Sequence, residues 1–167
     1  MLKKGFRKAC QSGLLSGHKV AGIKFRLIDG AHHIVDSSDY AFTLAAIGAM
    51  KQGIGVFEIG DWNVLEPIMS VEVVAPEEFQ GTVLGQLQRR SAIIQGTDSR
   101  DSWITIYCEV PLNEMFGYST EIRSSTQGKG EFSMEYSRYS PAAVNIQQQL
   151  LSDYDPSENP CNRMIEL

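Results

Sequence analysis

Apolar side chains recur every four residues at the start of the chain and then alternate with polar ones. The first spacing predicts a helix over residues 2–12, with an apolar stripe formed by Leu2, Phe6 and Cys10. The alternation that follows predicts a half-buried strand over residues 19–28. Its apolar positions are Ile23, Phe25 and Leu27.

A second helical stripe follows a short polar loop. Asp36 or Ser37 can cap this helix, and Asp39 lies in its first turn, where the helix dipole favours a negative charge. We expect the helix to end near Gln52. Its stripe consists of Phe42, Ala45, Ala46, Ala49 and Met50. The three alanines make this face thin, which favours close packing against a sheet.

After residue 63, the spacing of the apolar residues changes several times between a strand pattern and a helix pattern. Strand patterns are expected near 69–76, 92–95, 103–110 and 132–136, and helical patterns near 77–90 and 112–126. The inward positions of the third strand are Ile104, Ile106, Cys108 and Val110, and those of the last are Phe132, Met134 and Tyr136. The resulting order, β-α-β-β-α-β, predicts an α+β fold of the ferredoxin-like type, with two helices on one face of an antiparallel sheet.

Glycine and proline positions suggest how the chain divides. Residues 53–63 contain three glycines and are expected to connect two units. The predicted division is therefore a first part over 1–63, a ferredoxin-like domain over 64–139, and a tail over 140–167. The tail has one amphipathic helix near 142–151, and its polar remainder past residue 152 is expected to be poorly ordered.

Composition limits the class of protein. At 167 residues with 43% apolar and 21% charged side chains, the chain is expected to fold as one or two globular domains. It contains no apolar run of membrane-spanning length, and its basic start lacks the apolar core of a secretory signal. Cys10, Cys108 and Cys161 are far apart, which gives no metal-ligand spacing and favours a reducing compartment.

Charge is divided unevenly along the chain. Residues 1–35 carry seven basic side chains and one acidic one, whereas residues 36–167 carry eight basic and nineteen acidic. The first segment could bind a polyanion, although a solvated basic helix face explains the pattern equally well. Arg89 and Arg90 leave the same two interpretations open, a phosphate contact or a helix-end cation.

The loop over residues 29–39 holds the strongest candidate site. His32, His33 and Asp36 lie between a predicted strand and a predicted helix. Adjacent side chains on an extended backbone point to opposite faces, so His32 and His33 would not converge on one metal ion. A His33–Asp36 general base lacks a nucleophile placed by the sequence. We therefore expect an exposed contact loop, with no catalytic residue and no metal site.

No phosphate-cradling G-x-x-x-x-G-K-[ST] loop occurs in the sequence. The glycine-rich run 127–130 is shorter and precedes a strand, so we interpret it as a turn.

Two sets of residues resemble one known family. Asp29-Gly30 followed by His33, and then 35–39 and 41–42, resemble the end of the fourth domain of translation elongation factor G. Segments 65–73, 76–78 and 110–124, with Gly81 and Arg89-Arg90, resemble its fifth domain. The resemblance covers about residues 5–139. Residues 31–33 and 135–139 are most similar to the mitochondrial members of animals.

The resemblance implies a GTPase that moves transfer RNA and messenger RNA through the ribosome in the mitochondrial matrix, as a monomer and away from membranes. His33 matches the histidine at the tip of the family's fourth domain, which reaches the decoding region, and Asp36 matches the acidic start of the next helix. His32 stands beside them, where bacterial members carry an aromatic residue. Ribosomal RNA and proteins are the expected partners of the basic residues Lys3, Lys4, Arg7, Lys8, Arg89 and Arg90.

The resemblance does not extend to the family's GTP-binding domain or to the first part of its fourth domain. We therefore expect this chain alone to bind no cofactor and to catalyse nothing, since GTP and Mg²⁺ would belong to the rest of the protein. The half-domain over 1–63 should expose a sheet edge and apolar surface. Two alternatives stay open: a ribosome-recycling or rescue factor of the same superfamily, and a truncated, non-catalytic binding module.

Overall fold

The computed structural model describes all residues except 14, 57–60 and 166–167. The chain separates into two compact units. One consists of Met1–Asn63 together with Ala143–Leu167, and the other is Val64–Ala142.

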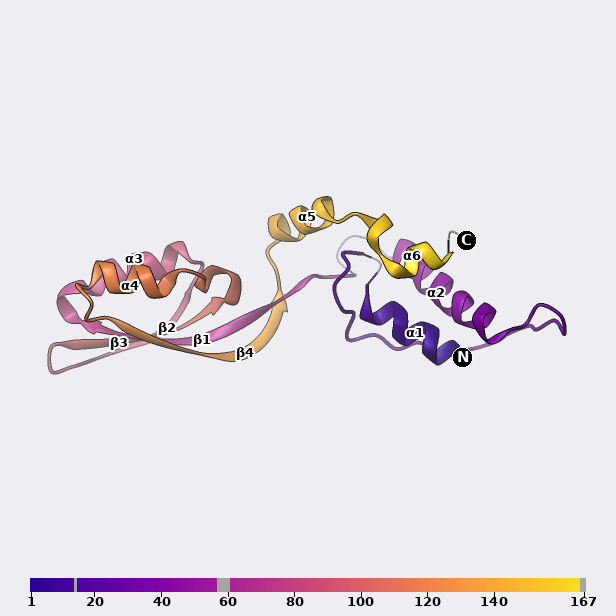
Figure 1. Cartoon of the computed structure of the whole chain (residues 1–167). Helices are drawn as coiled ribbons and strands as arrows, with labels where there is room; N and C mark the ends of the chain where they lie inside the picture. The colour runs from indigo at the N-terminus through magenta and orange to yellow at the C-terminus, as the bar shows by residue number, and fades with distance from the viewer. Residues whose placement is uncertain (14, 57–60, 166–167) are drawn as a thin grey trace. The chain divides into compact units, whose positions relative to one another are not determined.

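Four antiparallel strands form the sheet of the unit Val64–Ala142, and two helices cover one face of it (Figure 1). The strands lie in the order β2-β3-β1-β4. Their bounds are β1 Leu65–Pro76, β2 Ile93–Arg100, β3 Trp103–Pro111 and β4 Glu131–Pro141. The helices are α3 Gln80–Arg89 and α4 Tyr118–Ser125, each preceded by a 3-10 turn, η1 Glu77–Phe79 and η2 Leu112–Met115. The predicted β-α-β-β-α-β order and α+β class are confirmed.

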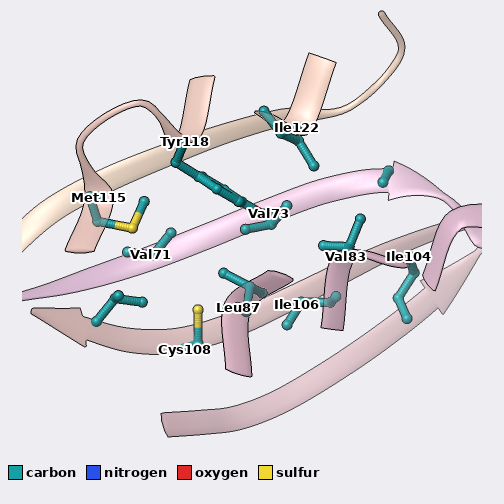
Figure 2. Packing of buried hydrophobic residues seen from close by; sticks show 12 residues of the cluster. Val71, Val73, Val83, Leu87, Ile104, Ile106, Cys108, Met115, Tyr118 and Ile122 are labelled. Atoms are coloured by element: carbon teal, nitrogen blue, oxygen red, sulfur yellow. The ribbon is translucent and has the colours of Figure 1, made fainter. Parts of the chain in front are cut away.

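The core of this unit lies between the sheet and its two helices (Figure 2). The predicted inward positions of β3 are all buried, and they meet Val83 and Leu87 from α3 and Tyr118 and Ile122 from α4. The prediction for β4 is correct only at Phe132, which packs against the Tyr118 ring with centroids 5.1 Å apart. Met134 and Tyr136 are exposed, because β4 lies at the edge of the sheet.

Two helices pack closely in the other unit. α1 Leu2–Gln11 contacts α2 Asp39–Val56, and a Cβ atom added at Gly5 would lie only 2.4 Å from the carbonyl oxygen of Thr43. Ala9 from α1 joins Ile47 and Met50 from α2 in a buried apolar cluster. Glycine at position 5 is therefore what allows the two helix backbones to approach.

The strand predicted over residues 19–28 is not formed. Ile23 and Phe25 do face the α1–α2 cluster, and the rings of Phe25 and Phe6 stack at 5.1 Å, but the backbone pairs with no strand in the described part of the chain. The prediction failed because alternation specifies which side chains face inward, whereas a strand also needs a hydrogen-bonded neighbour.

The stripe predicted for α2 is rotated relative to the observed one. The buried positions are Thr43, Ala46, Ile47 and Met50, whereas Ala45 and Ala49 are exposed. The buried face meets α1 and no sheet in the described residues, so the expected packing against a sheet is not found there. α2 also continues to Val56, into the stretch that was expected to be a connector. The central part of that stretch, residues 57–60, lies outside the described residues.

The prediction of a poorly ordered end is wrong for the described residues 153–165. Three short elements follow β4, namely α5 Val144–Asp153, η3 Pro156–Glu158 and α6 Pro160–Ile165. Cys161 of α6 is completely buried in the α1–α2 cluster. The composition of the tail is polar, but Cys161 and Met164 pack in the α1–α2 cluster, and the amides of Asn159 and Asn162 are buried. None of the described helices has the length and apolarity that a bilayer span requires.

Candidate functional site

The loop that carries His33 is closed by two reciprocal hydrogen bonds. The backbone N–H of His33 donates to Ser37 Oγ at 2.7 Å, and the backbone N–H of Ser37 donates to the carbonyl oxygen of His33 at 3.1 Å. At its start, the N–H of Gly30 donates to Asp29 Oδ1 at 2.7 Å. Local side-chain bonds of this kind order a loop without burying it.

The cap of α2 is Ser38, and not Asp36 or Ser37 as predicted. Ser38 Oγ accepts from the backbone N–H of Ala41 at 3.1 Å, the geometry of a helix N-cap. Asp36 lies earlier, within the loop, and Ser37 closes the turn there. The sequence offered several cap residues in a row, and only the backbone path distinguishes them.

His33 and Asp36 come together in residues 32–36 of this loop, which are called the tip below. His33 Nδ1 lies 3.4 Å from Asp36 Oδ2 and 3.4 Å from the backbone nitrogen of Val35, so it can either accept from the Val35 N–H or, when it carries a hydrogen, face the Asp36 carboxylate. Both side chains are largely exposed, at 72% and 82%, so the pair contributes little to stability.

Sequence reasoning missed the two most exposed apolar side chains of the tip. Ile34 is 94% exposed and Val35 is 82% exposed, next to His33. The available signal was two β-branched apolar residues that belong to neither neighbouring stripe. Apolar side chains held outward on an ordered loop are suited to contact a partner surface.

His32 is exposed but does not join this pair. It makes no hydrogen bond within the described residues, and no group of three metal-binding side chains converges anywhere in that part of the chain. The tip therefore presents two imidazoles, of which only His33 lies near a carboxylate, and two apolar side chains. It has the chemistry of a contact surface.

The basic residues predicted in the first helix form two rows along α1. Lys3 and Arg7 are four residues apart, as are Lys4 and Lys8, so the four side chains form two adjacent rows. Lys3, Lys4 and Arg7 are exposed. Within the described residues none of these side chains forms an ion pair with a carboxylate, which leaves their charge available for an anion.

Arg89 and Arg90 differ in what they contact. Arg90 pairs with Glu121 through Nη2 at 2.6 Å and Nε at 2.9 Å, and its Nη1 donates to the carbonyl oxygens of Glu114 and Phe116. Its guanidinium also lies 5.1 Å from the centroid of the Tyr118 ring. Arg89 is 73% exposed and touches Glu121 at 3.2 Å with one nitrogen. Arg89 is thus the more accessible of the two.

The sheet face opposite the helices is acidic. The strand register puts four glutamates on it: Glu72, Glu109, Glu131 and Glu135. Arg138 forms an ion pair and a hydrogen bond with Glu109, and this lowers the pKa of the Glu109 carboxyl.

Comparison with known proteins identifies both parts of the chain. Residues 1–55 match the family described as elongation factor G, domain IV, and residues 63–150 match elongation factor G C-terminus. The mitochondrial elongation factor G of Aedes aegypti is 66% identical over 153 residues, and that of Culex quinquefasciatus is 64% identical over 157. These matches cover 92% and 94% of this chain but 20% and 21% of the relatives.

A solved structure is also similar. A crystal structure of a protein from Thermus thermophilus superposes with a TM-score of 0.74 at 32% identity, over 91% of this chain and 23% of that one. The chain thus spans about a fifth of the length of the curated relatives. Its sequence, its α+β fold and the two matched domains show that the chain belongs to the elongation factor G family.

Proposed function

We propose that this chain is the ribosome-contacting, C-terminal part of a mitochondrial elongation factor G. The complete protein would couple GTP hydrolysis to the movement of transfer RNA and messenger RNA through the ribosome. The observation that carries the proposal is the ordered, outward-facing loop around His33 in a chain that matches domain IV of the family.

The tip side chains suit contact with folded RNA. Imidazole can stack on an unpaired base or hydrogen-bond a 2′-hydroxyl, and the adjacent Ile34 and Val35 can pack against a sugar or base face. The basic rows of α1 supply charges for phosphate contact, which holds an RNA partner without reading its sequence. Asp36, beside Nδ1 of His33, would help to orient the imidazole.

The nucleotide chemistry would lie outside this chain. GTP and Mg²⁺ would be bound by the part of the relatives that this chain does not match, so we expect the chain alone to bind no GTP and to act as a monomer. The curated relatives are named mitochondrial, and we place this protein in the mitochondrion on that basis.

The test uses a complete factor. This chain would replace the matching part of the Aedes aegypti protein, and translocation and GTP hydrolysis would be measured on mitochondrial ribosomes. We expect His33→Ala to slow translocation about tenfold while GTP hydrolysis is unchanged, because the tip acts after nucleotide binding.

His18→Ala is the matched control, since His18 is exposed but lies outside the tip. Equal translocation rates for the His33→Ala and His18→Ala proteins would contradict the role of the tip. If the unaltered chimera splits ribosomal subunits without translocating them, the recycling-factor alternative replaces the proposal.

A further inference from the structure

The end of the chain folds back onto the beginning of the same unit. Residues 154–165, here called the strap, contain η3 and α6, and α6 contributes Cys161 to the cluster between α1 and α2. Neither matched family domain reaches this segment, since the second match ends at residue 150. The role of the strap therefore has to be inferred from its own contacts.

Asn159 joins the strap to the end of α1. Its amide is 2% exposed, and Nδ2 donates to the carbonyl oxygens of Ser12 at 3.1 Å and Gly13 at 3.0 Å. Oδ1 accepts from the backbone N–H of Cys161 at 2.9 Å. Ser12 is the C-cap of α1, where carbonyl oxygens lack partners within the helix. Asn159 thus satisfies a helix end 147 residues away in sequence.

A second contact depends on a glycine. Gly17 has a φ of +73°, and a Cβ atom there would lie 2.8 Å from Cε2 of Tyr154. The ring of Tyr154 therefore lies directly on the backbone of the 12–18 loop, and its hydroxyl is 2.7 Å from Asn159 Nδ2. Both strap residues contact the loop that connects α1 to the extended segment before the tip.

The reactivity of the Cys161 thiol can be used to measure whether the strap is closed. Its side chain is completely buried, and its Sγ lies 3.6 Å from the carbonyl oxygen of Lys8. Burial raises the pKa of the thiol, while the charge of Lys8 acts in the opposite direction. A buried, protonated thiol reacts slowly with electrophiles, so modification requires the strap to leave.

We propose that residues 154–165 form a strap, latched by Asn159, that opens and closes over the α1–α2 cluster while the rest of the chain stays folded. The strap is short and is held by the Asn159 amide, the Tyr154 ring and the packing of Cys161 and Met164, a much smaller set of contacts than the core of the sheet unit. Its opening should therefore require less free energy than unfolding the sheet unit. When the strap opens, the 12–18 loop loses its contacts with Asn159 and Tyr154. The segment between this loop and the tip should then have greater conformational freedom.

The experiment follows each thiol of the full chain during labelling with N-ethylmaleimide, with the modified peptides resolved by mass spectrometry. In the unaltered protein we expect Cys10, which is partly exposed, to react first, and Cys161 and Cys108 to react slowly. Asn159→Ala should accelerate modification of Cys161 about tenfold, because the four hydrogen bonds of the Asn159 side chain are lost. Cys108, in the core of the sheet unit, should keep its rate.

Asn145→Ala is the matched control, because Asn145 is exposed on α5 and should leave all three rates unchanged. Tyr154→Phe keeps the ring and removes only the hydroxyl, so its effect on Cys161 should be smaller than that of Asn159→Ala. Amide exchange at Gly17 and Val20, whose N–H groups bond to carbonyl oxygens of Gly13 and Cys10, should rise with Asn159→Ala.

Three results would overturn the proposal. One is a Cys161 that reacts as fast as Cys10 in the unaltered protein, which would mean that the strap is not closed. Another is a Cys161 rate that Asn159→Ala leaves unchanged. The third is an acceleration of Cys161 that Cys10 of the same unit or Cys108 of the sheet unit shares equally, because this would mean that a whole unit unfolds and the strap does not open separately.

Discussion

Arg90 shows how little the identity of a residue says about its partner. The sequence placed Arg89 and Arg90 side by side at a helix end and could not separate a phosphate contact from a structural cation. In the structure, Arg90 is mostly buried and fastens the loop before α4, with Glu121 as its counter-ion. Arg89 shares that carboxylate but remains exposed. Only the fold determines which of two adjacent arginines points inward.

The two arginines should differ in their effect on stability. Arg90→Ala would leave two backbone carbonyls without their donor and the Glu121 carboxylate with only its exposed contact to Arg89, at a cost of about 3 kcal/mol. Arg89→Ala removes one exposed contact and should cost less than about 0.5 kcal/mol. Urea unfolding of both variants measures the difference. Equal destabilisation would show that the Arg90 contacts are not those that hold the loop.

At the scale of elements, sequence periodicity predicted the helices and strands of the ferredoxin-like unit but not all the elements of the other unit. The prediction for β3 is confirmed. The two strands that pair with β3 and the helices that cover it all belong to the same continuous stretch of chain. Residues 19–28 show a similar alternation and remain unpaired in the described residues. An element whose partner lies far along the chain, or outside it, cannot be predicted from its own period.

Gly5 sets the spacing of α1 and α2. Gly5→Ala should destabilise the unit by about 1–3 kcal/mol, because the new Cβ would collide with the carbonyl oxygen of Thr43. This loss is expected although alanine is the better helix former. Gly48→Ala is the control: nothing lies within 4 Å of the added Cβ, so it should stabilise α2 by up to about 1 kcal/mol. If thermal unfolding showed Gly5→Ala to be more stable than Gly48→Ala, the close approach of α1 and α2 at Gly5 would be refuted.

At the scale of the whole molecule, the two units differ in whether they are built from one continuous segment of chain or from two. Val64–Ala142 is one continuous stretch that contains its complete sheet and core. The other unit is discontinuous, since its cluster needs Cys161 from the far end of the chain. The two parts should therefore respond differently to being isolated.

We expect residues 64–142 expressed alone to unfold cooperatively, as a small single domain does. Residues 1–63 alone should be less ordered, since the α1–α2 cluster would lose its cover from α6. Near-ultraviolet circular dichroism and urea unfolding of the two fragments test this. The expectation would be contradicted if the 1–63 fragment unfolded cooperatively and the 64–142 fragment did not.

The sequence by itself determined the ferredoxin-like fold and the family. Each element of that fold is encoded by the period of its own residues, and the family by long matching segments. It also located the tip loop, because two histidines between a turn and a helix cap stand out without any structure. His33 and Asp36 lie close enough in the chain for local geometry to bring them together.

Only the tertiary structure decided the contacts between distant residues. It selected Ser38 as the cap, turned Arg90 inward and left Arg89 exposed. It also ordered the polar tail, which composition had assigned to disorder, through Asn159 and Cys161. The physical reason is the same in each case. A buried amide or a charged side chain is stabilised by the groups it meets, and when these lie elsewhere in the chain no local pattern specifies them.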